Sequence, residues 1–299
     1  MAAAETVGVL RMSTRTVESV GGLRRVGPTQ RMLNIVLYIF MIVLGVLFVI
    51  PLLWMVGASL KEEGHVLSTP PTLFPLHPQW SNYGQVLALI PRFFYNSVKL
   101  AFINVVGVLA VSALAGFAFG RLRFPGRNVL FVILLATAMI PGVAYLIPQY
   151  IIFERIGWVD TQLPLWVPRV FTPVFATFLM RQYFVSLPQE LEDAARVDGA
   201  GTFAVFWRIL LPETKPALGA IAIFTFLDSW NDLLGPLIYI NSRELQTLPV
   251  ALAQFQNEYF SEITLLMAGA TIAVLPVILV YLAAQRQFIR GITLTGINR

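Results

Sequence analysis

Four ionisable residues lie inside otherwise apolar stretches of the chain, where a charge is costly unless it meets water or an opposite charge. They are Lys99, Arg169, Asp228 and Asp232. The two aspartates enclose a polar cluster, Asp228-Ser229-Trp230-Asn231-Asp232, which sets carboxylates and an amide beside an indole ring. Such groups can line a path for a polar solute, or they can clamp neighbouring helices together. The residue types leave both interpretations open.

The two cations are less informative than the cluster. Lys99 stands near the end of its apolar stretch, so its side chain is expected to extend to the polar surroundings beyond that stretch. Arg169 also lies close to an end of its apolar stretch, and its role stays open.

The residue types do not support a catalytic or metal site. The chain has no cysteine, and its two histidines, His65 and His77, fall in one proline-rich polar segment. A nucleophile inside the membrane would therefore lack a histidine base. Residues 116–121 are too short for a G-x-x-x-x-G-K-[ST] phosphate-binding loop and end in arginine. We expect no catalytic residue and no metal ligand in this chain.

Membrane helices are the elements expected to carry these residues. Hydrophobic residues make up 57% of the 299 positions, and charged residues only 12%, against about 25% in soluble domains. A spanning helix needs about 20 mostly apolar residues. Six segments qualify: 32–57, 97–119, 129–147, 163–180, 217–240 and 263–284. The sequence therefore predicts an all-α integral membrane protein with six spans.

Glycines and prolines give further detail on these spans. Gly116 and Gly120 form a small-xxx-small pair in the second span, which predicts close packing against another helix. Prolines interrupt the third and fourth spans, where neighbouring helices must satisfy the freed carbonyls. These prolines are Pro141, Pro148, Pro164, Pro168 and Pro173.

The distribution of Lys and Arg predicts the orientation, because cytoplasmic segments carry the excess of both. One side of the predicted membrane holds Arg11, Arg15, Arg24, Arg25, Arg31, Arg121, Arg123, Arg127, Arg181, Arg196, Arg208, Lys215, Arg286, Arg290 and Arg299. The opposite side holds only Lys61, Arg92, Arg155 and Arg243. We expect cytoplasmic tails over residues 1–31 and 287–299, a membrane domain over 32–286, and an external proline-rich loop over 61–95. The basic residues flank apolar segments, so we expect membrane lipid and no nucleic acid as a partner.

The cytoplasmic loop over residues 186–216, between the fourth and fifth spans, has a helical pattern of its own. Glu190, Glu192 and Asp193 suit the positive end of a short helix. Leu191, Ala194 and Ala195 follow at a spacing that gives one small apolar face. Gly199 suits the left-handed turn that ends such a helix.

A second short helix is expected after that glycine. Phe203, Phe206, Trp207 and Leu210 have the spacing of one bulky helix face. The pair of helices can dock in the groove of a partner protein or lie on the bilayer surface. Surface helices are usually rich in Lys and Arg, whereas the first helix is acidic, so the pattern favours a protein partner.

This loop resembles the EAA loop of ABC importer permeases. That pattern is EAA, three residues, Gly, nine residues, Ile, one residue and Leu-Pro. Here Asp193-Ala194-Ala195 precedes Gly199 at the required spacing, and Ile209 and Leu211-Pro212 follow in turn. Asp193 stands where the family has Glu, which keeps the charge and shortens its reach by one methylene.

Other segments are similar to the shorter, six-span permease of the maltose-type carbohydrate uptake branch. They are Asn96-Ser97, the turn over residues 121–126, Trp230-Asn231-Asp232 and, loosely, the end over 291–296. The resemblance implies a bacterial inner-membrane permease subunit that forms half of the path for a sugar or oligosaccharide.

The resemblance also implies the partners. They are a second permease subunit, two copies of a cytoplasmic ATPase that binds ATP and Mg²⁺, and an extracytoplasmic solute-binding protein. The loop residues implied to couple to the ATPase are Glu190, Glu192, Asp193, Ala194, Ala195, Gly199, Ile209, Leu211 and Pro212. Asp228, Trp230, Asn231 and Asp232 are the candidate substrate path. A permease for a non-sugar solute such as glycerol phosphate is one alternative, and an autonomous channel or secondary transporter is another.

Overall fold

The computed structural model describes residues 28–66, 72–258 and 263–296, and every regular element in those ranges is a helix. The chain separates into two units, residues 1–53 and 54–299. The N-terminal tail expected over residues 1–31 lies outside the described residues up to residue 27.

The first unit contains most of α1, Pro28–Ser59. Within its 30-residue candidate span, the most apolar window of 18 residues has a mean hydropathy of 3.0, and no residue of that window is buried. A helix that is apolar all round and uncovered requires lipid or another protein around it. This helix contains the first expected span.

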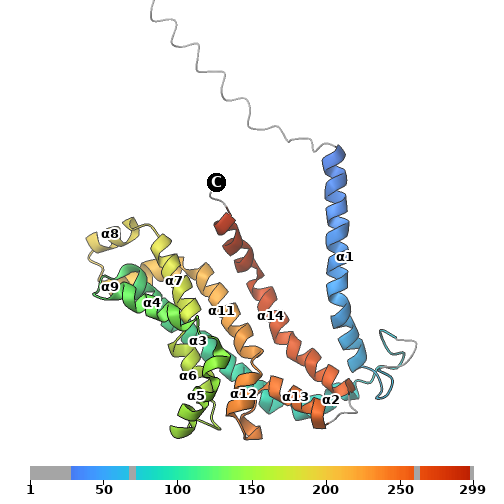
Figure 1. The fold of residues 1–299 in the computed structure, drawn as a ribbon. Coiled ribbons are helices and arrows are strands. Elements are labelled where there is room, and N and C mark those ends of the chain that lie inside the picture. Colours follow the sequence, from blue (N-terminus) through green and yellow to red (C-terminus); the bar gives the residue numbers. More distant parts are fainter. Residues whose placement is uncertain (1–27, 67–71, 259–262, 297–299) are drawn as a thin grey trace, which may run out of the picture. The chain divides into compact units, whose positions relative to one another are not determined.

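Two further helices of the second unit confirm expected spans. They are α3, Pro91–Arg121, and α14, Ile263–Gly296. α14 continues well beyond residue 284, so most of the segment expected as a C-terminal tail is helical. α3 packs against α6, α7 and α11 and is the central element of this unit (Figure 1).

The other three expected spans are broken rather than straight. α4, Arg127–Thr137, and α5, Gly142–Arg155, meet at a bend of 96° beside Pro141. α6, Leu163–Phe171, and α7, Val174–Ser186, are separated at Pro173 and together form one 24-residue candidate span. α11, Lys215–Trp230, ends within the polar cluster, and α12, Leu234–Tyr239, follows it. In the described residues, four helices are long and apolar enough to span a membrane. The number rises to six if α4 with α5, and residues 202–213 with α11, each form one bent span.

Short helices replace part of the expected external loop. α2, Ser81–Leu89, lies within the 61–95 segment, and α13, Leu248–Glu258, follows the 3₁₀ turn η3, Arg243–Leu245. Both helices pack against α14. Their buried residues join Trp230 in one apolar cluster, so these helices cover one end of the bundle.

Asp160 fastens two loops at this part of the fold. It has a positive φ of 61°, and its carboxylate accepts hydrogen bonds from the backbone N–H groups of Asn241 and Ser242, at 3.0 and 2.7 Å. The Ser242 hydroxyl adds a third bond at 2.6 Å. The Ser242 hydroxyl, then its backbone N–H, lower the pKa of the Asp160 carboxyl below its ordinary value of 3.8. The Asp160 carboxylate therefore stays charged at neutral pH, and its hydrogen bonds to residues 241 and 242 weaken only as the pH falls through that lowered pKa.

Close packing of α3 on α7 confirms the interpretation of the paired glycines. A Cβ atom built on Gly116 would lie 2.5 Å from Met180 Cβ and 2.9 Å from the backbone nitrogen of Arg181. A Cβ on Gly120 would lie 3.2 Å from Phe184 Cβ. The two backbones approach too closely for a side chain at Gly116.

We predict that Gly116→Ala destabilises the protein. The overpacking costs about 1–3 kcal/mol, more than the roughly 0.5–1 kcal/mol that alanine gains over glycine within a helix. Gly84→Ala in α2 is the matched control, because nothing lies within 4 Å of its Cβ position. Thermal unfolding of the purified protein checks this. Equal melting temperatures for the two variants would contradict the close packing.

Candidate functional site

A cavity of about 660 Å³ lies among α5, α6, α7, α11 and α12. Its polar lining comprises Gln149, Arg169, Thr172, Thr225, Asp228 and Asp232. Its aromatic lining comprises Tyr145, Phe175, Phe224 and Tyr239. Phe175 and Phe224 meet edge to face, with ring centroids 6.3 Å apart. Hydrogen-bonding groups beside aromatic rings can bind a polar solute.

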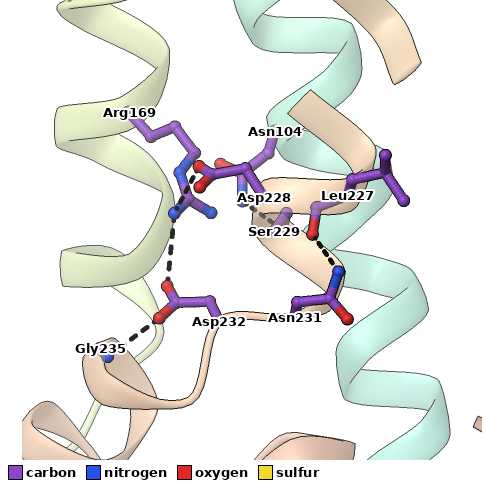
Figure 2. A network of polar contacts seen from close by, with 8 residues as sticks. All are labelled: Asn104, Arg169, Leu227, Asp228, Ser229, Asn231, Asp232 and Gly235. Atoms are coloured by element: carbon purple, nitrogen blue, oxygen red, sulfur yellow. Dashed lines mark hydrogen bonds and ion pairs between the residues drawn. The ribbon is translucent and has the colours of Figure 1, made fainter. Parts of the chain in front are cut away.

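Arg169 forms the centre of the charge network in this cavity (Figure 2). Its Nη2 lies 3.0 Å from Asp228 Oδ2 and 3.3 Å from Asp232 Oδ2. The other oxygen of Asp232 accepts the Gly235 N–H at 3.0 Å, at the start of α12. The network thus joins α6 to both sides of the break between α11 and α12.

Only part of the predicted polar cluster faces the cavity. Asp228 and Asp232 line it, whereas Trp230 and Asn231 do not. The indole of Trp230 is buried, donates to the Ala273 carbonyl at 3.1 Å and packs on Phe94 and Phe226. Asn231 donates to the Leu227 carbonyl at 2.9 Å, on the opposite side of the chain from Arg169 (Figure 2).

Helical spacing explains only the part of this division that lies in α11, where Asp228 and Trp230 are two residues apart and therefore do not share a face. On this ground the sequence could have separated Trp230 from Asp228, whereas Asp232 follows the end of α11 and its direction depends on the break before α12. The sequence could not have placed Phe175 or Phe224, because apolar residues on spans carry no local sign of facing a cavity.

The clamp interpretation also has a physical counterpart in the cluster. Ser229 accepts a hydrogen bond of 2.8 Å from Asn104 on α3, and Asn104 is only 1% exposed. Ser229 therefore ties α11 to α3, while its neighbour Asp228 points to the cavity. The hydrogen bond of Ser229 supports the clamp interpretation for that residue, whereas the path interpretation of Asp228 and Asp232 stays a prediction.

The 186–216 loop folds outside the long apolar helices. It contains α8, Glu190–Val197, then Gly199 with φ +82°, then α9, Thr202–Ala204. A π-helical turn, η2, Val205–Leu210, and α10, Leu211–Glu213, complete it. The expected left-handed conformation of Gly199 is confirmed.

Glu192 and Asp193 are neighbours with opposite environments. Glu192 is buried, and its carboxylate lies 3.1 Å from the guanidinium of Arg121 at the end of α3. Arg121 also donates to the Leu187 carbonyl, and Arg196 lies 3.7 Å from Glu192. Asp193 and Glu190 are exposed. Glu192 thus holds α8 to α3, which leaves Asp193 and Glu190 as the acids that face outward.

The two apolar faces expected in the loop are each split in the structure. Ala195 is buried, whereas Leu191 and Ala194 are exposed. Phe206 and Leu210 are also buried, and Phe206 lies 5.0 Å from Phe117 of α3 between ring centroids.

Phe203 and Trp207 instead stack on each other at the surface, 70% and 59% exposed. The wider π-helical turn alters the rotation per residue, so the spacing of a regular α-helix does not describe this segment. Ile209, Leu211 and Pro212 are half-buried.

A polar cavity among broken helices and a folded loop beyond them are features that a transport permease requires. Residues 112–294 match the family of binding-protein-dependent transport system inner membrane components. The chain belongs to this family and is a multi-pass inner-membrane permease subunit of an ABC importer. Members of the family act in general with a partner permease, an ATPase and a binding protein.

The similarity to individual permeases extends over most of the chain. The arabinooligosaccharides transport system permease protein AraQ of Bacillus subtilis (strain 168) is 33% identical over 92% of this chain and 99% of its own length. The sn-glycerol-3-phosphate transport system permease protein UgpE of Yersinia enterocolitica is 31% identical, over 84% and 93%. A bacterial ABC transporter involved in the import of the acidic polysaccharide alginate has the same fold, with a TM-score of 0.74 and 24% identity over 87% and 98%.

We predict that Glu192→Ala lowers stability much more than Asp193→Ala. Removing one partner of a buried ion pair costs about 3–5 kcal/mol, because it leaves Arg121 uncompensated, whereas Asp193 is exposed. Thermal unfolding and limited proteolysis within the loop measure the difference. Similar losses for the two variants would contradict the structural assignment of Glu192.

Proposed function

We propose that this chain is one of two permease subunits of an ATP-driven importer for a sugar or oligosaccharide, and that it forms half of the translocation path. Two copies of a cytoplasmic ATPase bind ATP and Mg²⁺, and an extracytoplasmic solute-binding protein delivers the solute. The chain itself binds no cofactor. The observation that carries the proposal is the 186–216 loop, with its acids and aromatic rings directed outward and its interior fixed to α3.

The outer surface of that loop has the chemistry of a docking element. Val197, Phe203 and Trp207 are exposed apolar side chains beside the exposed acids Glu190 and Asp193. Exposed apolar groups of this kind indicate a binding surface for a partner protein. We assign that partner to the ATPase, with Asp193 as the acid that meets it.

Movement of the docked ATPase reaches the spans through rigid contacts. Glu192 links α8 to Arg121 at the end of α3, and Phe206 packs between Phe117 of α3 and Phe184 of α7. A shift of the loop therefore displaces α3 and α7 together, as in rigid-body gating around a central site.

The cavity supports a sugar as the solute. Its carboxylates and its glutamine can bind hydroxyl groups, and Phe175 and Phe224 offer aromatic faces to the C–H surfaces of a sugar ring. The relative AraQ is named as an arabinooligosaccharide permease, and the relative UgpE as a glycerol phosphate permease. A phosphorylated solute is therefore the second candidate.

Reconstitution with the operon-encoded partners tests this function. We expect the ATPase activity of the complex in proteoliposomes to rise several-fold with the binding protein and one member of a panel of neutral sugars. Gly199→Pro should abolish that stimulation and the uptake, because proline cannot adopt φ +82°.

The outcomes separate the rival functions. Uptake without ATP would support a channel or secondary transporter, and stimulation by glycerol phosphate alone would support the second candidate. Retention of full uptake by an assembled Gly199→Pro complex would contradict the coupling role. Gly201→Ala, in the same loop with open space around its Cβ position, is the control.

We further propose that both termini and the 186–216 loop are cytoplasmic. Single cysteines are informative because the chain has no native cysteine. In intact cells an impermeant thiol reagent should label Asn241→Cys and leave Arg123→Cys unlabelled until the cells are opened. Both positions are exposed in the structure. The reverse pattern of labelling would invert the topology.

A further inference from the structure

The charges that line the cavity do not balance. Its lining holds one arginine, Arg169, and two aspartates, Asp228 and Asp232, and among the described residues no lysine, histidine or glutamate joins them. The formal charge of the lining is therefore +1 − 2 = −1. Arg169 is already paired with both carboxylates, so its charge is compensated from within the protein.

Asp228 is the more accessible of the two carboxylates. Asp232 is held by Arg169 and by the Gly235 N–H, and its side chain is 22% exposed. The Asp228 side chain is 70% exposed, and Arg169 is its only charged partner among the described residues. The carboxylate of Asp228 thus remains open to the cavity, where it can accept a hydrogen bond from a hydroxyl or an ammonium group.

We propose that Asp228 makes this half of the path selective against anions, so that the solute is a neutral or cationic sugar and not a uronate or a phosphate ester. This inference rests on the proposed function and narrows its substrate class. A low-dielectric wall around the cavity strengthens the field of a fixed charge. An anionic solute meets that field with no free cation to offset it, whereas the hydroxyl groups of a neutral sugar donate to the carboxylate.

The charge of the cavity also separates the two candidate solutes, a neutral sugar and a phosphate ester. A phosphate ester would need a cation that is available for binding, and phosphate recognition commonly uses arginine or lysine. The described lining of this half of the path offers no such group, because Arg169 is engaged by two carboxylates. The charge of this half of the path therefore disfavours glycerol phosphate.

Thiol labelling measures this field without any transport step. Thr225 lines the cavity three residues before Asp228, on the same side of α11. We would introduce Thr225→Cys into the cysteine-free chain within the full complex. The rates of reaction with a cationic and an anionic methanethiosulfonate reagent are then compared, each relative to a free thiol in solution.

The cationic reagent should react about three- to tenfold faster than the anionic one, because the carboxylate of Asp228 lies within one helical turn of the introduced thiol. Asp228→Asn should bring the ratio close to one. Asp160→Asn, which removes a carboxylate outside the cavity, should leave the ratio unchanged. A ratio of one in the parent protein, or a ratio that Asp228→Asn does not alter, would overturn the proposal.

Salt dependence provides a second measurement that needs no change at Asp228. The ratio in the parent protein should fall towards one between about 0.01 and 1 M salt, as the screening length shrinks from about 30 to 3 Å. A ratio insensitive to salt would overturn the electrostatic explanation. Because labelling requires neither ATP nor sugar, failure of the sugar panel with the ratio intact would count against the proposed function alone.

Discussion

The close approach of α3 to its neighbours is the constraint on which both sites depend. The glycine at position 116 brings α3 against Met180 of α7, and the glycine at 107 brings it against Val170 of α6. Asn104 then fixes α11 through Ser229. Because α6 and α11 both pack on α3, Arg169 and Asp228 face each other at 3.0 Å. At the end of α3, Arg121 contacts Glu192 of the 186–216 loop.

The break between α11 and α12 leaves backbone polar groups without helical partners, so it requires polar surroundings. Non-helical backbone within a membrane is tolerated where it is buried in protein or lines a water-filled cavity. Here Asp232 accepts the Gly235 N–H at the start of α12, and Arg169 compensates the charge that this carboxylate carries. Asp232 thus serves both the start of α12 and the cavity, whereas the three residues between the two aspartates do not line the cavity.

Hydropathy and motif spacing predicted the spans, the paired glycines and the left-handed turn at Gly199, because each depends on residues close together in the sequence. The direction of individual side chains was less predictable. Trp230 was grouped with the aspartates by proximity, although the helical repeat turns it to the opposite face. The π-helical turn at 205–210 divided Phe203 and Trp207 from Phe206, and no local pattern signals such a turn. The two carboxylate partners of Arg169, Asp228 and Asp232, lie about sixty residues further along the chain. Their pairing with Arg169 could not be predicted without knowing how α6 and α11 pack on α3.

The ion pair of Arg121 and Glu192 joins the 186–216 loop to α3, although removing two charges from water costs free energy. Replacing such a pair with apolar residues is often neutral or stabilising, so stability alone does not require it. The pair nevertheless attracts α8 to the end of α3 by its opposite charges, and Arg121 also donates a hydrogen bond to the Leu187 carbonyl at the end of α7. The ion pair and this hydrogen bond hold α8 near the ends of α3 and α7. The proposed coupling role requires such an attachment, because movement of the loop has to reach α3.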